Sequence, residues 1–408
     1  MQYRILAPSR IYGEVTLPAS KSISNRALTI NALAGGGYSL RNLSDCDDTQ
    51  VMLRWLNDRP DTIDIGAAGT AMRFSTALLA VGEGTHVITG SERMKNRPIK
   101  ILVDALRWLG AEIEYMEKDG FPPLCIKGHR VLDGGKVVLP GGVSSQYISA
   151  MLMIGPVMKK GLELHLVGDV VSKPYISMTI DIMRSFGARV ETVGDGNIRV
   201  YPGGYRRNAY VVENDWSAAS YWYEIVALAE NADSRIVLPG LHGDSLQGDS
   251  KGAELFKQLG VATAYTEGGV ILEKGGLCVS HLDYDFVEMP DLAQTFVVTC
   301  CMLGVTFHFT GLQSLKIKET DRIDALKREM LKLGYVLEEK NDSELLWNGQ
   351  IGAPQENVAI DTYEDHRMAM AFAPVAIRRR GLRINDPGVV SKSYPRFWEN
   401  LKEVGFEL

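Results

Sequence analysis

Apolar and polar residues follow one pattern that recurs five times along the chain. Each copy has an amphipathic helical stretch, then a glycine, then a strand in which apolar and polar residues alternate. A glycine in this place fits the end of a helix, where a left-handed backbone is needed. The copies are DALRWLGAEIEY at 104–115, DIMRSFGARVETV at 181–193, AELFKQLGVATAY at 253–265, REMLKLGYVLEE at 328–339 and WENLKEVGFEL at 398–408.

The spacing of these glycines gives the size of the repeating unit. They stand at 110, 187, 260, 334 and 405, at intervals of 77, 73, 74 and 71 residues. Such a unit exceeds the ~20–50 residues of solenoid repeats and is long enough to be a small α/β layer. A further helical pattern, VMLRWLND at 51–58, lies too close to Gly110 for a full copy. We therefore predict six units in two groups of three, an α/β (α+β) chain of two similar domains with a shortened first unit.

Two stretches bear on the domain organisation. Around Tyr205–Val212, two glycines and two arginines interrupt the periodicity, and we place a domain crossing there. The least polar stretch, Thr295 to Phe309, is shorter than the ~20 residues that a membrane helix needs. We read it as a buried helix that runs into a buried strand.

Composition narrows the class of protein. With 408 residues, 45% hydrophobic and 23% charged, the chain matches globular proteins rather than disordered, collagenous or coiled-coil ones. The net charge of −6 argues against a nucleic-acid binder. Five cysteines without CxxC spacing argue against a disulfide framework or a zinc site. The start, MQYRILAPSR, lacks the apolar core of a signal peptide, so we expect a cytoplasmic protein without membrane attachment.

Cations gather at predicted helix starts in the first half of the chain. In LPASKSISNRAL at 17–28, Ser20 or Ser22 can cap a helix that carries Lys21 and Arg26. Cations there oppose the helix dipole, and a bound anion is the simplest compensation, although an ordinary capped surface helix is the alternative. Three similar stretches, each also explicable as a plain turn, a solvated face or a cap, are IGAAGTAMRF at 65–74, SERMKNRPIK at 91–100 and GGVSSQYISAML at 141–152.

The second half of the chain repeats this theme. In LKIKETDRIDAL at 315–326, we expect Lys318 and Arg322 on one face of a helix with Glu319 beside them, either as an anion site or as an intrahelical salt-bridge network. In MPDLAQT at 289–295, Asp291 looks like a helix N-cap. The remaining stretches are YEDHRMAMAFA at 363–373, with His366 and Arg367, and VVSKSYPRF at 389–397, with Lys392. Because the whole chain is negative, this gathering of cations indicates a strongly anionic ligand.

These strings together resemble the 5-enolpyruvylshikimate-3-phosphate synthase family of enolpyruvyl transferases. The matching strings include LPASKSISNRA, AGTAMR, RMKNRPI, SSQY, GDVVSKPYI, PDLAQT, IKETDRI, EDHRMAM and SKSYPRFW, in the family's order from residue 17 to 398. The resemblance implies two domains of three βαβαββ units each, 19–212 and 1–18 with 213–408, which close on the substrates like a clamp. It also implies a monomer that needs no metal or organic cofactor.

The reaction that the resemblance implies is transfer of the enolpyruvyl group of phosphoenolpyruvate to the 5-hydroxyl of shikimate 3-phosphate. By the same analogy Asp291 is the base, Glu319 is an acid with a raised pKa, and Lys21 and Lys392 support the leaving phosphate. Shikimate 3-phosphate would contact Lys21, Ser22, Arg26, Ser144, Ser145, Gln146, Ser172, Tyr175, Asp291, Ser314 and Lys318. Phosphoenolpyruvate would contact Lys21, Gly69, Arg97, Gln146, Arg322, Arg367 and Lys392.

The sequence departs from the family pattern at three points. Ala67 stands where the phosphoenolpyruvate loop usually has Asn, Ser314 replaces a longer amide, and roughly 20 residues of the ~75-residue first repeat are lacking. These departures affect the expected affinity for phosphoenolpyruvate more than the reaction type. Two alternatives are a non-catalytic binding protein on the same scaffold and the related transferase that acts on UDP-N-acetylglucosamine. The latter carries a reactive cysteine near the position of RMKNRPI, and residues 91–100 contain none.

Overall fold

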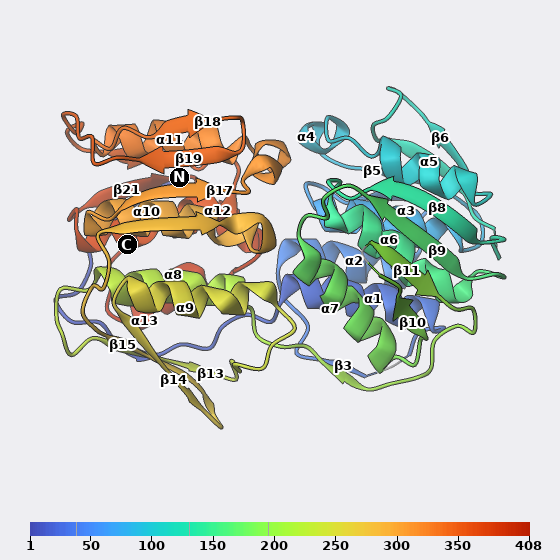
Figure 1. The fold of residues 1–408 in the computed structure, drawn as a ribbon, viewed down its shortest axis with the longest axis horizontal. Helices are drawn as coiled ribbons and strands as arrows, with labels where there is room; N and C mark the ends of the chain where they lie inside the picture. Colours follow the sequence, from blue (N-terminus) through green and yellow to red (C-terminus); the bar gives the residue numbers. More distant parts are fainter. Residues whose placement is uncertain (38, 130, 195) are drawn as a thin grey trace. The chain divides into compact units, whose positions relative to one another are not determined.

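The chain forms two compact units. The computed structural model describes residues 1–37, 39–129, 131–194 and 196–408. Residues Ala19–Val212 make one unit, called here the central unit, and Met1–Pro18 with Glu213–Leu408 make the other, called the terminal unit. In Figure 1 the central unit runs from blue to green along the sequence.

The central unit contains two complete βαβαββ repeats and one reduced repeat. In each complete repeat the first two strands pair in parallel and the others antiparallel, in the sheet orders β4-β5-β7-β6 and β10-β11-β9-β8. The first of them has β4 (Thr62–Asp64), α3 (Gly69–Ala80), β5 (Thr85–Thr89), α4 (Glu92–Lys95), α5 (Lys100–Trp108), β6 (Glu112–Tyr115) and β7 (Leu124–Lys127). The second has β8 (Gly135–Pro140), α6 (Ser145–Ile154), η1 (Gly155–Val157), β9 (Leu162–Val167), α7 (Lys173–Ser185), β10 (Val190–Thr192) and β11 (Asn197–Val200).

The reduced repeat is the one that the sequence predicts to be short. It has helices α1 (Lys21–Leu33) and α2 (Asp47–Asp58), with only a two-stranded sheet of β3 (Leu40–Arg41) and β12 (Tyr210–Val211). Helix α2 ends in Arg59, whose backbone is left-handed with φ of 46°, where the other copies have glycine. The spacing of the glycines therefore does not reveal the first copy of the repeat.

The terminal unit contains three repeats, and the start of the chain completes two of them. Strand β2 (Tyr12–Glu14) joins the sheet of α8 (Trp216–Leu228), β13 (Arg235–Pro239), η2 (Gly248–Lys251), α9 (Gly252–Gln258), β14 (Val261–Thr266) and β15 (Gly269–Lys274). Strand β1 (Gln2–Ile5) joins that of β20 (Ala359–Ile360), α12 (His366–Phe372), η6 (Ala373–Ile377), β21 (Leu382–Asn385), η7 (Pro387–Lys392) and α13 (Phe397–Glu403). The middle repeat has β16 (His281–Asp285), η3 (Phe286–Glu288), η4 (Pro290–Leu292), α10 (Ala293–Leu303), β17 (Thr306–Thr310), η5 (Gln313–Ile317), α11 (Arg322–Lys332), β18 (Glu338–Lys340) and β19 (Glu344–Trp347).

The five predicted glycines all adopt the left-handed backbone that the helix–turn–strand pattern requires. Their φ values are +99°, +81°, +86°, +95° and +97° at Gly110, Gly187, Gly260, Gly334 and Gly405. At Gly110 the following amide, of Ala111, donates to the carbonyl of Leu106 and so closes the end of α5. The repeat pattern and the fold class are thereby confirmed, because each glycine ends a helix. The first four are followed by β6, β10, β14 and β18, and Gly405 by the bridge from Glu407 to Leu6.

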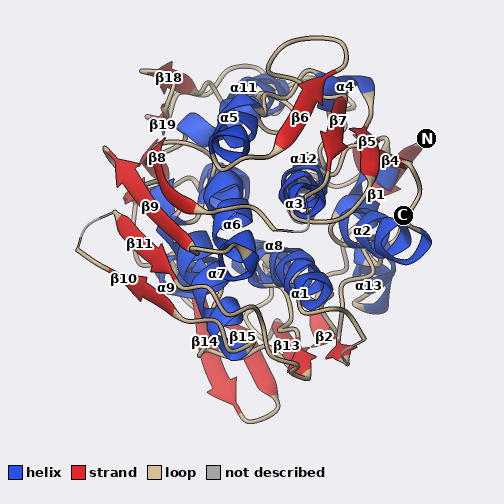
Figure 2. Cartoon of the chain, turned by 90° about the vertical axis from the view of Figure 1, so that its right-hand side faces the viewer, coloured by secondary structure: helices blue, strands red, loops and turns tan. Residues whose placement is uncertain are grey.

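Each unit buries helices that are apolar on most of their surface. In α8 every residue except Ser217 is buried, and α10 packs Phe296 against Phe256 and Phe286. The predicted buried helix and strand are α10 and β17, joined at Gly304 with φ of 72°. Figure 2 shows the strands of the central unit outside helices α1, α3 and α6. Within the described residues, no helix has both the length and the apolar character to cross a membrane.

Candidate active site

Three helices of the central unit begin at predicted site residues. Lys21 is the first residue of α1, Gly69 of α3 and Ser145 of α6, and the three helices pack on one another. Of the two proposed caps of α1, Ser20 is the one used, since its hydroxyl accepts from the amide of Ile23. Ser144 caps α6 by accepting from the amide of Gln146 at 3.3 Å. The N-terminus of a helix carries a partial positive charge and exposed amide groups, so these segments can bind anions.

Gly69 and Arg97 come together although 28 residues separate them in the sequence. A Cβ atom on Gly69 would lie 2.5 Å from Nη1 of Arg97, so the guanidinium rests directly on the glycine. The hydroxyl of Thr70, next to Gly69, accepts from the side-chain amide of Gln146 at 3.0 Å. The structure thus places Gly69, Arg97 and Gln146, three of the residues predicted to bind phosphoenolpyruvate, at one place.

The segment that carries Arg97 is held firmly in position. The carbonyl of Pro98 accepts from the hydroxyl of Tyr147 at 2.5 Å and from Nη2 of Arg73 at 2.9 Å. Arg97 is 9% exposed, and its Nε hydrogen bonds to no group within the described residues. A nearly buried cation held in this way can bind an anion with little loss of side-chain entropy.

Lys21 and Arg26 lie on the same helix in different surroundings. The Nζ of Lys21 is 3.3 Å from the carboxylate of Asp48 on α2, and its side chain keeps 15% exposure. Arg26 is 2% exposed and donates to Thr179 at 2.7 Å, to the carbonyl of Ser22 at 2.8 Å and to Ser149 at 3.1 Å. Burial lowers the pKa of Arg26 to about 10. Arg26 therefore joins α1 to α6 and α7, while Lys21 pairs with Asp48 at the start of α1.

A strained residue marks the start of α7. Ser172 has a left-handed backbone, with φ of 55°, directly before the helix. The neighbouring amide of Val171 donates to the carbonyl of Gly141, which brings this turn against the loop that leads to Ser144. Tyr175, one turn into the helix, lies with its ring 5.8 Å from the guanidinium of Arg26. Non-glycine residues with such backbones cluster at functional sites.

The terminal unit gathers a second group of charges around Asp291. Nη1 of Arg322 is 3.1 Å from one carboxylate oxygen of Asp291, and Nη2 of Arg367 is 2.9 Å from the other. The Nζ of Lys318 lies 3.6 Å from the same carboxylate. Burial lowers the pKa of Lys318, and the negative charge of Asp291 opposes that effect. Three cations from two separate segments, 318–322 and the start of α12, therefore hold one carboxylate.

Glu319 forms the other half of this group. Its two oxygens lie 3.0 Å from Nη2 of Arg322 and 2.9 Å from Nζ of Lys392. Arg322 in turn is held by Asp365, 2.7 Å from its Nε. Burial acts to lower the pKa of the Arg322 guanidinium, but the carboxylates of Asp365, Glu319 and Asp291 outweigh it and raise the pKa above its usual value.

Sequence patterns missed several members of these groups. Asp365 looks like a simple cap of α12, and it does accept from the amide of Arg367 at 2.9 Å, but it also neutralises the buried Arg322. Asp249 lies beneath the Asp291 group, where its carboxylate accepts from the hydroxyl of Ser217. Burial, together with the nearby charge of Asp291, raises the pKa of Asp249 to about 7. Asp48 is a third omission, because nothing near it in the sequence marks it as a partner of Lys21.

Two local predictions were wrong in geometry. Helix α11 begins only at Arg322, with Asp321 as its cap, so Lys318 and Glu319 precede the helix instead of sharing a face with Arg322. Asp321 accepts from the amide of Asp324 and so stops the helix from extending backwards. Asp291 lies inside the short helix η4, not at the cap of α10, because Pro290 starts a tight turn of its own.

Four other residues singled out by the sequence are Ser314, Ser22, Ser145 and Ala67. The hydroxyl of Ser314 is enclosed and hydrogen bonds to nothing within the described residues. Ser22 contributes its carbonyl to Arg26, and Ser145 is half-buried at the first position of α6. Ala67 lies in the turn before α3 with an exposed side chain.

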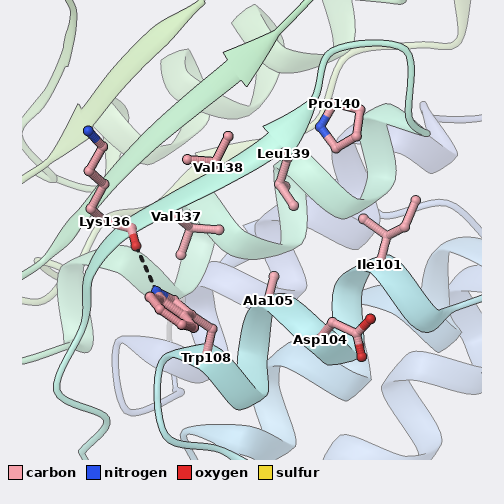
Figure 3. Close-up of a pocket in the computed structure, with 9 residues that line it drawn as sticks. All are labelled: Ile101, Asp104, Ala105, Trp108, Lys136, Val137, Val138, Leu139 and Pro140. Carbon is pink, nitrogen blue, oxygen red and sulfur yellow. Dashed lines mark hydrogen bonds between the residues drawn. The ribbon is translucent and has the colours of Figure 1, made fainter.

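A separate apolar groove of the central unit has none of these features. It has a volume of about 500 Å³ and lies between α5 and β8. Figure 3 shows the indole of Trp108 beside this strand, with its Nε1 donating to the carbonyl of Lys136 at 3.0 Å. No predicted site residue lines it. Among the described residues, no cluster of three side chains suited to hold a metal ion is found.

Comparison with known proteins gives one consistent answer. Residues 5–58 and 56–401 match the family model described as EPSP synthase (3-phosphoshikimate 1-carboxyvinyltransferase). A 3-phosphoshikimate 1-carboxyvinyltransferase of Bacteroides fragilis (strain ATCC 25285) is 60% identical over 406 residues, which cover 100% of this chain and 98% of the relative. The enzyme of the same name from Aliivibrio fischeri (strain MJ11) is 38% identical, with 97% of each chain covered.

A solved structure agrees with the fold. An EPSP synthase from Acinetobacter baumannii, determined at 2.37 Å, superimposes with a TM-score of 0.77, covering 100% of this chain and 99% of that one. Its sequence identity is 22%, so this likeness speaks for the fold alone.

Proposed function

The chain belongs to the EPSP synthase family, and on that premise we propose how its own residues carry out the family's reaction. The chain is an enzyme, a 3-phosphoshikimate 1-carboxyvinyltransferase, as its relatives over the full length are named. The reaction transfers the enolpyruvyl group of phosphoenolpyruvate to the 5-hydroxyl of shikimate 3-phosphate and releases phosphate. Each substrate carries a phosphate and a carboxylate, which accounts for the number of cations in both groups.

The proposal assigns the two substrates to different parts of the charged groups. Shikimate 3-phosphate is bound by Lys21, Ser22, Ser172 and the Ser144–Gln146 loop, with Tyr175 beside its ring. Phosphoenolpyruvate is bound by the Gly69–Arg97 pair and by Arg322, Arg367 and Lys392. Arg26 acts mainly by holding the carbonyl of Ser22, since all three of its side-chain nitrogens already have partners.

The first chemical step is an addition. Asp291 takes the proton from the 5-hydroxyl as this oxygen attacks the second carbon of phosphoenolpyruvate, a task suited to a positioned carboxylate. Glu319, which pairs with Arg322 and Lys392 in the structure, has to take up a proton before this step. It then gives that proton to the methylene carbon, which becomes a methyl group. The product of this step is a tetrahedral ketal phosphate, and Arg322 joins the two acid–base residues because its Nη1 and Nη2 contact Asp291 and Glu319 respectively.

The second step is an elimination. A proton leaves the methyl group, the bond between carbon and the phosphate oxygen breaks, and the double bond forms again. Glu319 recovers the proton it gave, while the proton held by Asp291 passes to the departing phosphate. Lys392, 2.9 Å from Glu319, and Lys21 stabilise the negative charge of the leaving group.

One observation carries this proposal: Asp291 and Glu319 are joined through a single buried arginine. Arg322 is 1% exposed, so its contacts fix the distance and orientation of the two carboxylates. Such fixed orientation is what a concerted transfer of two protons requires. A non-catalytic binding protein on the same scaffold would not need this link between Asp291 and Glu319.

The variant Asp291→Asn tests the assignment of the base. We expect its turnover to fall by about 10²–10⁴, while shikimate 3-phosphate binds nearly as well, because an acid–base group acts on the rate. Asp285→Asn is the matched control, since Asp285 caps the nearby helix η3 through the amide of Val287 and has no assigned part in the reaction. A loss of less than tenfold for Asp291→Asn, measured by phosphate release, would show that another group removes the proton.

Location and assembly complete the proposal. All five cysteines are free, as expected of a protein from a reducing compartment, so we propose that the enzyme works in the cytoplasm. We further propose a monomer that binds only small-molecule substrates, with no nucleic-acid or membrane partner and no metal or organic cofactor.

A further inference from the structure

A groove of the terminal unit is lined by five arginines. It has a volume of about 580 Å³ and lies where η6 leads into β21, next to β1 and the loop at 354–358. Its charged lining residues are Arg4, Arg378, Arg379, Arg380 and Arg383, and no carboxylate is among the described residues that line it. The chain as a whole has a net charge of −6, so this concentration of positive charge is a local feature.

The sheet forces two of these arginines against each other. Strands β1 and β21 are antiparallel, and Arg4 lies directly opposite Arg383 in their register. Like charges in opposite positions of a sheet are destabilising. Within the described part of the chain, the single carboxylate in ion-pair range of any of the five is Glu230, 3.6 Å from Arg378. The positive charge of the groove is therefore largely uncompensated by the protein.

The walls of the groove are tied together by the backbone. The amide of Gly381 donates to the carbonyl of Ile5 at 3.1 Å, and that of Arg383 to the carbonyl of Val358 at 3.2 Å. The amide of Gln355 donates to the carbonyl of Lys332 at 2.9 Å. Arg383 is also held through its side chain, which donates to the carbonyl of Asn357. The groove is thus formed before any ligand arrives, which reduces the entropy lost on binding.

The lining of the same groove is not all charged. It includes the apolar residues Leu333, Pro354 and Val358. At Gly381 the backbone is left-handed, with φ of +78°, and a Cβ there would lie 3.2 Å from Nε of Arg4. Because Gly381 has no side chain, the guanidinium of Arg4 can lie close to the backbone at this position. The groove therefore combines forked hydrogen-bond donors with apolar side chains that an organic group can contact.

We propose that this groove binds a small organic molecule that carries two or more phosphate groups. Guanidinium forks match phosphate oxygens in pairs, and each phosphate brings roughly two negative charges. A single phosphate ion would leave most of the five positive charges unbalanced. The volume falls within the ~300–1,000 Å³ of typical small-molecule sites, so a nucleotide-sized ligand fits. The negative net charge of the chain disfavours a nucleic acid as the occupant.

The proposal is independent of the enzymatic assignment. None of the groove residues belongs to the candidate active site, and neither Arg379 nor Arg383 has a role in the proposed chemistry. The proposed ligand can bind in this groove even if the assigned reaction is wrong. Equally, the reaction can be right even if the groove binds nothing.

Calorimetric titration of the full chain tests the proposal, with ATP, pyrophosphate, inorganic phosphate and a short single-stranded DNA as probes. We expect one molecule of ATP or pyrophosphate per chain with a dissociation constant below about 1 mM at 150 mM salt, and weaker binding of phosphate and DNA. The double variant Arg379→Gln with Arg383→Gln should bind ATP at least tenfold more weakly. Arg328→Gln is the control, since Arg328 is exposed and paired with Asp324 at 2.9 Å.

The outcomes separate this site from the cationic active site. Phosphate release from the enzyme's own substrates should be unchanged in the double variant, whereas its ATP binding should be at least tenfold weaker. Equal ATP binding by the double variant and the original chain would overturn the proposal, because the probe would then occupy other cations. Tighter binding of the DNA than of ATP would also overturn it, in favour of a nucleic-acid surface.

A second pair of measurements guards against a folding defect. Because Arg4 and Arg383 repel each other, Arg383→Gln should leave the melting temperature unchanged or raise it. The charge-conserving variant Arg379→Lys with Arg383→Lys keeps the positive charges but loses the forked donors, so we expect ATP binding about three- to tenfold weaker. Full affinity in this lysine variant would contradict recognition by paired guanidinium contacts.

Discussion

At the scale of single residues, Gly69 has a role that depends on what it lacks. Its backbone conformation is an ordinary one, so any residue could adopt it. The constraint comes from Arg97, whose guanidinium occupies the space of a Cβ atom. Arg97 can lie at the start of α3 only because position 69 has no side chain.

The variant Gly69→Ala should therefore displace Arg97 without unfolding the protein. The clash involves the end of a flexible side chain, so the melting temperature should stay within a degree or two. Loss of a charge-assisted hydrogen bond is worth about 1.5–3 kcal/mol, so KM for phosphoenolpyruvate should rise about 10- to 100-fold. Gly268→Ala is the control, since a Cβ at Gly268 meets nothing within 4 Å. Unchanged kinetics for Gly69→Ala would mean that Arg97 does not bind this substrate.

Asp249 is the other residue whose behaviour depends on its surroundings. Its carboxyl is 5% exposed, and its pKa is raised to about 7 by burial and by Asp291. Between about pH 4 and pH 7 the folded chain therefore keeps a proton that the unfolded chain has lost. The free energy of unfolding must fall as the pH rises through this window, by up to about 1.4 kcal/mol per pH unit.

Asp249→Asn should remove this part of the pH dependence, because the amide is neutral at every pH. Relative to the original chain, the variant should gain about 2–3 kcal/mol of unfolding free energy between pH 5 and pH 8. Urea unfolding of both proteins at the two pH values measures the difference. A difference that stays constant across this range would show that Asp249 titrates near its ordinary pKa.

At the scale of elements, helix starts decide where the charges lie, and the sequence predicted only some of them. Ser20 and Ser144 were found because a small polar residue before an apolar helix is a strong local signal. The prediction of a helix through Lys318 was wrong. Asp321 caps α11, so the helix begins at Arg322 and does not extend back to Lys318. Even so, Lys318 contacts Asp291 from outside the helix, because the contact depends on the fold around α10 and α11 rather than on local periodicity.

Two aspartates of the terminal unit cap helices in the same way but differ in burial. Asp321 caps α11 at a half-exposed position, whereas Asp365 caps α12, is fully buried and pairs with Arg322. Loss of a cap costs about 1 kcal/mol, and breaking a buried ion pair costs about 3–5 kcal/mol. We therefore expect Asp321→Ala to lose about 1 kcal/mol of unfolding free energy and Asp365→Ala about 4 kcal/mol.

Urea unfolding compares these two variants directly. If Asp365→Ala does not fold, Asp365→Asn keeps the cap and removes only the charge, and it should still lose more than Asp321→Ala. Equal losses for the two caps would mean that Asp365 contributes nothing through Arg322.

At the scale of the whole molecule, the repeat pattern predicted the architecture because each unit ends its helices at a left-handed glycine. It could not reveal that β1 and β2 complete sheets built from residues more than 200 positions later, since such pairing leaves no local mark. The candidate site was predictable where motifs carry cations, as at Lys21, Arg97 and Arg367. It was not predictable where a lone carboxylate, such as Asp48 or Asp249, gains its partner through the fold.

The central claim is that the two charged groups serve one reaction of two substrates. The most direct test measures phosphate release with phosphoenolpyruvate and shikimate 3-phosphate together, and with each omitted in turn. We expect release only when both are present, at a rate that saturates with each of them despite Ala67 and the reduced first repeat. Release from phosphoenolpyruvate alone, or none with both substrates present, would contradict the account.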